Sequence, residues 1–208
     1  MPWHTVAQGE WVAQIAWRHG IGDAMKVWDH PENAGLKARR GDPNLLHPGD
    51  RLFIPVVSAS TSDVATGMVH RFVIRVPKSR LRLAVHDEDN QPLASRPFKL
   101  KLGSKTHEGT TDGNGIIDVA IPVTATSGEL EIDDHVLPIF VGQLDPVAEP
   151  SGVGGRLENL GFLRSQGVRD PDEALQAAVG RFQAQHGLEV TSEINDETRH
   201  ELEERHGC

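Results

Sequence analysis

Two stretches decide the fold of the N-terminal part of the chain: residues 3–20, WHTVAQGEWVAQIAWRHG, and residues 44–55, NLLHPGDRLFIP. In the first stretch, the apolar residues Val12, Ile15 and Ala16 recur at the spacing of one helix face. Gly20 follows this run where a helix commonly adopts a left-handed conformation and stops. The stretch therefore predicts a short extended segment, a turn and a helix.

The second stretch predicts the strand that pairs with the first segment. Its Pro-Gly turn at residues 47–50 leads into a short apolar strand over residues 51–54, which Pro55 closes. Between the two stretches, residues 23–29 have helical spacing, and Pro31 prevents that helix from continuing. The predicted order is strand, helix, helix, strand.

This order and these residues resemble the LysM family of glycan-binding modules. The positions that carry the resemblance are Thr5, Val6, Gly9, Glu10, Val12, Ile15, Ala16, Asn44, Gly49, Leu52, Ile54 and Pro55. The segment from His30 to Asp42 is longer than the family usually shows. The resemblance implies a βααβ fold and a peptidoglycan or related N-acetylglucosamine-containing glycan as partner.

The glycan groove that this resemblance implies lies between two loops. Its candidate residues are Gly9, Glu10, Trp11, Val12, Asn44, Leu45 and Leu46. Glycans are commonly held by loop hydrogen bonds and an apolar face under the sugar ring, and Trp11 is placed to supply that face. Two alternatives stay open for Trp11, since it could instead cap the small core or contact the next domain.

Composition excludes several classes of function. The formal net charge is -9 and no basic run occurs, which argues against a nucleic-acid partner. Cys208 is the only cysteine, so no internal disulfide forms. No apolar run is long enough to span a membrane, and no secretory signal pattern follows Met1. We therefore expect synthesis in the cytoplasm without a Sec signal peptide.

A polar linker over residues 58–67 precedes a region of short alternating apolar runs. The runs cover residues 72–76, 81–85, 98–102, 115–121, 129–132 and 136–141. They predict a small all-β domain of about six or seven strands over residues 68–145. The turns at residues 87–93 and 111–115 resemble those of prealbumin-like or immunoglobulin-like sandwiches.

The same turns raise a calcium hypothesis. Their carboxylates belong to Asp87, Glu88, Asp89 and Asp112, and hard cations take several oxygen ligands. The stronger interpretation is that these side chains hold tight turns by local hydrogen bonds. We therefore expect no metal and no cofactor.

The last part, residues 146–208, predicts three helices. The second begins at Asp170-Pro171, where an N-cap is followed by Pro at the first helical position and by Glu173 three residues after the cap. The third begins after Asn195 with acids in its first turn, where the helix dipole favours them. The sequence thus indicates a three-helix core.

This part resembles the small helical peptidoglycan-binding domain that often accompanies cell-wall hydrolases. The residues that carry this resemblance are 157–162, 178–188, which include Phe182-Gln183, and 194–202. The resemblance implies a second glycan site, for which the candidate residues are Phe162, Arg181 and Gln185.

Because such modules accompany hydrolases, the sequence could also contain catalytic residues. None of the eleven histidines forms a His-Glu-x-x-His zinc motif. His200 and His206 are six residues apart on one predicted helix, which favours an exposed helical surface as their role. Cys208, at the C-terminus, is not placed as a nucleophile. The sequence leaves open that folding brings two carboxylates together as a catalytic pair. However, no domain is large enough for the deep cleft of a glycosidase. We expect no enzyme.

The sequence therefore predicts a multi-domain α+β protein: a LysM-like domain at 1–57, a linker at 58–67, a β-sandwich at 68–145 and a three-helix domain at 146–208. The expected function is non-catalytic binding of peptidoglycan or another cell-wall glycan. The alternative is a structural adaptor, or a spike- or baseplate-associated component, of a contractile (type VI secretion or phage-tail-like) injection apparatus, with other proteins of that apparatus as partners. An effector enzyme carried by such a device is a third class. The expected site of action is the bacterial cell envelope or an injection particle.

Overall fold

The computed structural model describes the chain except for residues 1–2, 59–62, 88–90, 164–169 and 208. The chain divides into two compact units, one of residues 1–44 and 48–143 and the other of residues 45–47 and 144–208. Helices and antiparallel sheets are both present, which confirms the α+β class. Among the described residues, no helix is long and apolar enough to cross a membrane.

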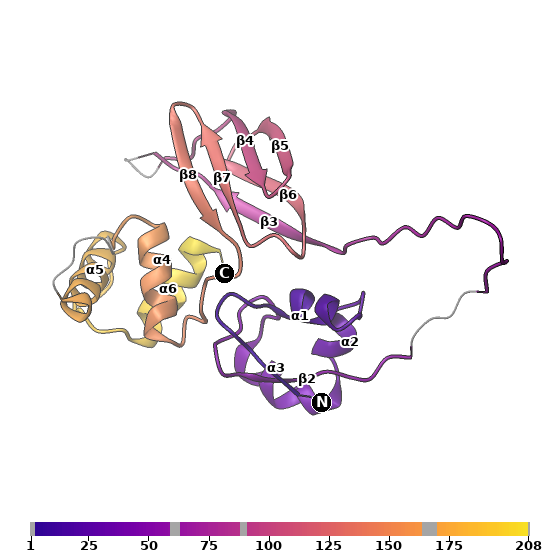
Figure 1. Cartoon of the computed structure of the whole chain (residues 1–208). Helices are drawn as coiled ribbons and strands as arrows, with labels where there is room; N and C mark the ends of the chain where they lie inside the picture. Colours follow the sequence, from indigo (N-terminus) through magenta and orange to yellow (C-terminus); the bar gives the residue numbers. More distant parts are fainter. Residues whose placement is uncertain (1–2, 59–62, 88–90, 164–169, 208) are drawn as a thin grey trace. The chain divides into compact units, whose positions relative to one another are not determined.

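The N-terminal part is a two-stranded antiparallel sheet with short helices (Figure 1). In chain order the elements are β1 (Trp3–Thr5), α1 (Val12–Arg18), α2 (Met25–Trp28), η1 (Pro31–Asn33), α3 (Ala34–Arg40) and β2 (Arg51–Phe53). Val12, Ile15 and Ala16 are fully buried, and Gly20 has a φ of +76°, so the predicted first helix and its end are confirmed.

The segment that follows the second predicted helix and precedes the last strand is itself folded into η1 and α3, which the sequence did not indicate. Asn33 is fully buried and joins η1 to its neighbours. Its Nδ2 donates to Val27 O (2.7 Å) and Phe53 O (2.9 Å), and its Oδ1 accepts from Phe53 N (2.7 Å). One side chain thus fixes α2, η1 and β2 relative to one another.

The predicted strand at residues 72–76 is wrong. The chain from Ile54 to Pro77 contains no strand among its described residues, and part of the predicted linker (59–62) lies outside them. The apolar side chains of the supposed strand are largely exposed: Phe72 69%, Val73 67% and Ile74 80%. Aromatic and β-branched residues alone did not make a strand here, because no strand among the described residues pairs with the segment.

Six strands form the sandwich: β3 (Lys78–Ala84), β4 (Pro97–Leu102), β5 (Lys105–Thr110), β6 (Ile116–Pro122), β7 (Ser127–Ile132) and β8 (His135–Phe140). One layer is the antiparallel pair β3-β6, and the other is the antiparallel sheet β5-β4-β7-β8 (Figure 1). Side chains from both layers form the core: Val85, Leu100, Leu102, Ile117, Ile121, Leu130 and Ile132. Strands β3, β4, β6, β7 and β8 correspond to predicted apolar runs.

Strand β8 lies at the edge of its sheet, which explains how it contains Pro138. Just beyond the strand, Val141 N donates to Thr126 O (2.9 Å). The odd-numbered residues of β8 therefore direct their N–H groups toward the neighbouring strand β7. Pro138 therefore falls where the missing N–H would face outward, the position that proline occupies in edge strands. The proline also removes one donor from the open edge.

The C-terminal unit contains α4 (Pro150–Asn159), α5 (Pro171–Gln185) and α6 (Asp196–His206). Their core consists of Val153, Leu157, Ala178, Val179, Phe182 and Leu202, all fully buried. Asp170 Oδ1 accepts from Asp172 N (3.0 Å) and Glu173 N (3.3 Å), so the predicted N-cap is correct. Asn195 caps α6 in the same way through Thr198 N (2.8 Å).

Candidate functional site

The structure brings together the two loops predicted to hold a glycan in the N-terminal part. Val12 N donates to Pro43 O (3.0 Å), which places the loop before α1 beside the loop that contains Asn44. Gly9, with a φ of +78°, makes the turn between β1 and α1. Asn44 is exposed, and its backbone N and Nδ2 both donate to Asp42 Oδ1, at 2.7 and 2.9 Å.

Most of the predicted groove residues are buried. The exposed fractions are 8% for Glu10, 3% for Trp11, 0% for Val12 and 4% for Leu46, whereas Leu45 is half-buried. A buried indole is the alternative placement considered for Trp11, and in this structure it presents no face to a sugar ring. Its role in glycan binding stays a prediction that requires the ring to be uncovered.

Glu10 is a structural anchor. Burial opposes its ionisation, but the hydrogen bonds from Ala7 N (2.9 Å) and His4 (2.7 Å), with the charges of His4 and Arg18, hold the pKa of Glu10 below its usual value. The carboxylate thereby joins β1, the turn and α1. A group with a lowered pKa is unsuited to act as a general acid.

The three candidates in the C-terminal unit lie on one surface. Arg181 Nη2 donates to Phe162 O (2.7 Å), and Gln185 follows Arg181 by one helical turn on α5. Arg181 and Gln185 are both exposed, whereas Phe162 is half-buried with its ring 5.3 Å from that of Phe182. The surface thus offers a guanidinium and an amide to a polar ligand beside an aromatic ring that packs on the core.

Gln183, in the sequence motif Phe182-Gln183, is fully buried and holds the loop before α6. Its Nε2 donates to Thr191 Oγ1 (3.0 Å), Glu193 O (3.1 Å) and Thr198 Oγ1 (3.0 Å). Its Oε1 accepts from Thr191 N (3.0 Å) and Ser192 N (2.9 Å). The amide is therefore a structural link between α5, the loop and α6.

Two histidines of the C-terminal unit have lowered pKa values because their environments disfavour the charged form. Burial lowers the pKa of His206 to about 4, with a further contribution from the charge of Arg156. Its Nε2 lies 2.9 Å from Asn159 Nδ2, so the prediction that His206 is an exposed residue is wrong, because the end of α6 packs on α4. Burial also lowers the pKa of His186, and Arg205 adds to this effect while Glu201 opposes it.

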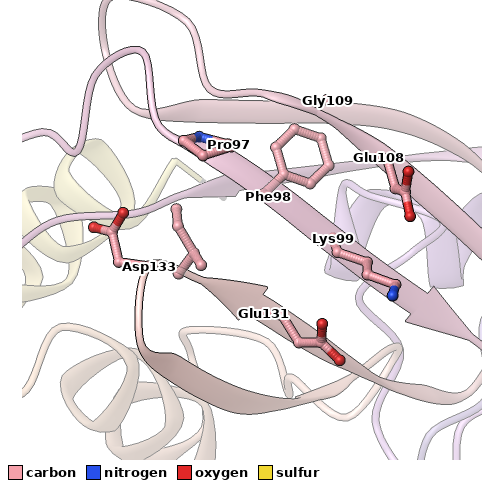
Figure 2. A pocket seen from close by; sticks show the side chains of 8 residues that line it. Pro97, Phe98, Lys99, Glu108, Gly109, Glu131 and Asp133 are labelled. Atoms are coloured by element: carbon pink, nitrogen blue, oxygen red, sulfur yellow. The ribbon is translucent and has the colours of Figure 1, made fainter.

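The sandwich carries a shallow depression of about 370 Å³ over β4, β5 and β7. Figure 2 shows Phe98, Lys99, Glu108 and Glu131 along it. A hydrogen bond from Lys101 holds the pKa of Glu131 below its usual value, so Glu131 is unsuited to act as the general acid of a glycosidase. The depression is open and offers no enclosed cleft.

The turn carboxylates of the calcium hypothesis serve local turns where the structure describes them. Asp112 Oδ1 accepts from Asn114 N (2.8 Å) and Ile116 N (2.9 Å), and Asp87 Oδ1 accepts from Gln91 N (2.8 Å). Glu88 and Asp89 lie outside the described residues, as does Cys208. Among the described residues, no group of three or more His, Cys, Asp or Glu side chains could hold a metal ion.

Comparison with known protein families gives one match. Residues 155–202 match the family model described as "Putative peptidoglycan binding domain". The helical C-terminal unit therefore contains a peptidoglycan-binding domain at residues 155–202, and the roles of Phe162, Arg181 and Gln185 in it stay predictions. Neither the curated proteins nor the solved structures give a match. The family match begins at residue 155, and the LysM resemblance of residues 3–55 stays a prediction.

Sequence reasoning missed one group of surface residues. Trp3, His30 and Phe53 form a cluster of aromatic rings at the two strands of the N-terminal sheet. Antiparallel pairing of the first and last predicted strands would place Trp3 beside Phe53, and this is the signal that could have found the cluster.

Proposed function

We propose that this protein binds peptidoglycan without cleaving it. The observation that carries the proposal is the peptidoglycan-binding domain at residues 155–202, whose helices form a complete core and leave Arg181 and Gln185 exposed. Peptidoglycan contains hydroxyl, amide and carboxylate groups. A guanidinium and a carboxamide on one helix face are suited to bind these groups.

The architecture and the electrostatics of the described residues favour binding over catalysis. A glycosidase needs a carboxyl group that is protonated near neutral pH, and neither Glu10 nor Glu131 is suited to that role, because the pKa of each is lowered. A zinc peptidase needs three protein ligands that converge on an ion, and no such group occurs among the described side chains.

The site assignment is tested with Arg181→Ala and Gln185→Ala in the full chain. Binding to purified insoluble peptidoglycan should weaken about three- to tenfold for Arg181→Ala, since one charge-assisted hydrogen bond is lost. Arg199→Ala is the matched control, because this arginine lies on α6 and pairs with Asp196. Equal binding by Arg181→Ala and the control would contradict the assignment.

The non-catalytic role is tested by incubating sacculi with the chain and measuring soluble muropeptides. We expect no release above the level with buffer, while a known hydrolase in parallel releases fragments. Release that depends on the chain would overturn this part of the proposal.

A second candidate function is supported by the exposed apolar segment at residues 69–76. We propose as the alternative that the protein is an adaptor or a spike- or baseplate-associated component of a contractile injection apparatus, acting at the cell envelope or within the particle. Phe72, Val73 and Ile74 are between 67% and 80% exposed and lie between Arg71 and Arg75, and an exposed apolar segment of this kind is suited to pair with a partner's sheet edge. We then expect the chain to co-sediment with purified injection particles. The double substitution Phe72→Ser and Ile74→Ser should abolish this co-sedimentation. Co-sedimentation unchanged by the substitutions would exclude the segment.

A further inference from the structure

The outer face of the β1-β2 sheet carries a cluster of aromatic rings. The rings of Trp3 and Phe53 meet edge to face, with centroids 5.4 Å apart and an angle of 78°. The ring of His30 stacks on Phe53 at 4.5 Å and 27°. Trp3 is 38% exposed, and Phe53 and His30 are half-buried. Three rings in contact thus form an apolar surface that solvent reaches.

The register of the sheet shows that this surface is not the core. Trp3 pairs with Phe53, and His4 pairs with Leu52, so side chains of the two pairs alternate between the faces. Leu52 is fully buried and defines the inner face. The Trp3 and Phe53 side chains therefore lie on the outer face, where burial in the core does not explain two large aromatic residues.

Arg51 adds a positive charge to this surface. Its guanidinium carbon lies 5.0 Å from the centroid of the Trp3 ring, within the range of a cation–π contact. Its side chain is exposed, and no carboxylate of a described residue forms an ion pair with it. Arg39 and Arg40 of the same module differ, because both pair with Asp50. The indole holds the Arg51 guanidinium in place while its N–H donors are free for a ligand anion.

We propose that Trp3, Phe53 and Arg51 form a binding surface for peptidoglycan fragments that carry both a sugar ring and a free peptide carboxylate. The proposal rests on the proposed function, since the peptidoglycan-binding domain indicates which ligand is present. Apolar ring faces pack against the C–H groups of a sugar, and a guanidinium binds a carboxylate. The surface consists of strand residues and is distinct from the loops at residues 9–12 and 44–46.

The experiment measures binding of two soluble probes to the full chain by calorimetry. The first probe is a disaccharide-tetrapeptide from peptidoglycan, which carries free carboxylates, and the second is an uncharged N-acetylglucosamine tetramer. Trp3→Ala should weaken binding of both probes about three- to tenfold, from the loss of one stacking contact. Arg51→Gln should weaken only the carboxylate-bearing probe, about two- to fivefold, and high salt should remove this difference.

Two controls keep the test independent of folding. Met25→Ala and Lys26→Gln remove an exposed apolar side chain and an exposed cation from α2 of the same module and should leave both affinities unchanged. Trp3→Phe preserves an aromatic ring and should retain most of the binding. In the NMR spectrum of the wild-type chain, the resonance of the Trp3 indole N–H should shift on titration with either probe.

Together, the outcomes distinguish a failure of this inference from a failure of the proposed function. If the wild-type chain binds sacculi but Trp3→Ala and Arg51→Gln bind both probes as the wild type does, the surface has no role and the peptidoglycan function stands. Wild-type binding to sacculi without binding to either probe also overturns the surface. If the wild-type chain binds neither sacculi nor the probes, both proposals fail.

Discussion

At the scale of single residues, Asp170 and Asn195 cap α5 and α6 by accepting hydrogen bonds from backbone N–H groups two or three positions away, so each cap depends on local sequence alone. Trp11 and His206 show the opposite case. Whether each side chain is covered depends on segments far away in the sequence, and no local pattern carries that information.

Gln183 provides the most direct test of a single residue. Gln183→Leu removes five hydrogen bonds and leaves the Thr191 and Ser192 N–H groups without their acceptor. We expect the free energy of unfolding of the helical unit to fall by about 2–4 kcal/mol. Urea unfolding followed by helical circular dichroism measures this, with the exposed Gln185→Leu as control. A variant as stable as the control would show that the network contributes little.

The pKa of His206 predicts a pH dependence of stability. Its folded pKa of about 4 lies below the ordinary value of 6.5, so between these values the unfolded chain binds more protons than the folded chain. Stability should therefore rise with pH from about 4 to 6.5 and level off above that range, by about 2–3 kcal/mol in total. Unfolding of the wild type is compared with His206→Gln across this range, with the exposed His200→Gln as control. A parallel pH dependence in wild type and His206→Gln would contradict the assignment.

At the scale of elements, hydrophobic periodicity located most of the structure. Periodicity failed for a polar strand that pairs with its neighbour and for an apolar segment that does not pair. β5 (Lys105–Thr110) lacks an apolar alternation, and its register with β4 holds it in the sheet. The segment at residues 72–76 is apolar, but no strand among the described residues pairs with it. Strand formation is decided by the neighbour as much as by the sequence of the strand itself.

The folded segment between α2 and β2 depends on one buried amide. Asn33→Leu removes the hydrogen bonds to Val27 and Phe53 and leaves the Phe53 N–H and C=O groups without this partner. We expect a loss of about 2–4 kcal/mol in the stability of the N-terminal module. The quenching of tryptophan fluorescence by acrylamide should increase as buried Trp28 becomes accessible. Asn44→Ala, at an exposed position, is the control and should change neither quantity appreciably.

At the scale of the whole molecule, the chain combines an aromatic-faced α/β module, a β-sandwich and a helical peptidoglycan-binding domain. Their net charges differ: residues 1–58 carry six acids and six bases, whereas residues 146–208 carry twelve and six. Peptidoglycan is itself acidic, so we expect binding by the helical unit to depend on individual donors, for which Arg181 is proposed, and not on the overall charge of the unit. The class of the fold was predictable from the sequence. Which surfaces are exposed and able to bind a ligand could be determined only from the structure.

The most direct test of peptidoglycan binding is equilibrium co-sedimentation of the full chain with purified sacculi at low and at physiological salt. We predict saturable retention that persists at physiological salt and weakens in Arg181→Ala. Absence of retention at both salt concentrations, with the chain shown to be folded by circular dichroism, would contradict the central claim that this protein binds peptidoglycan.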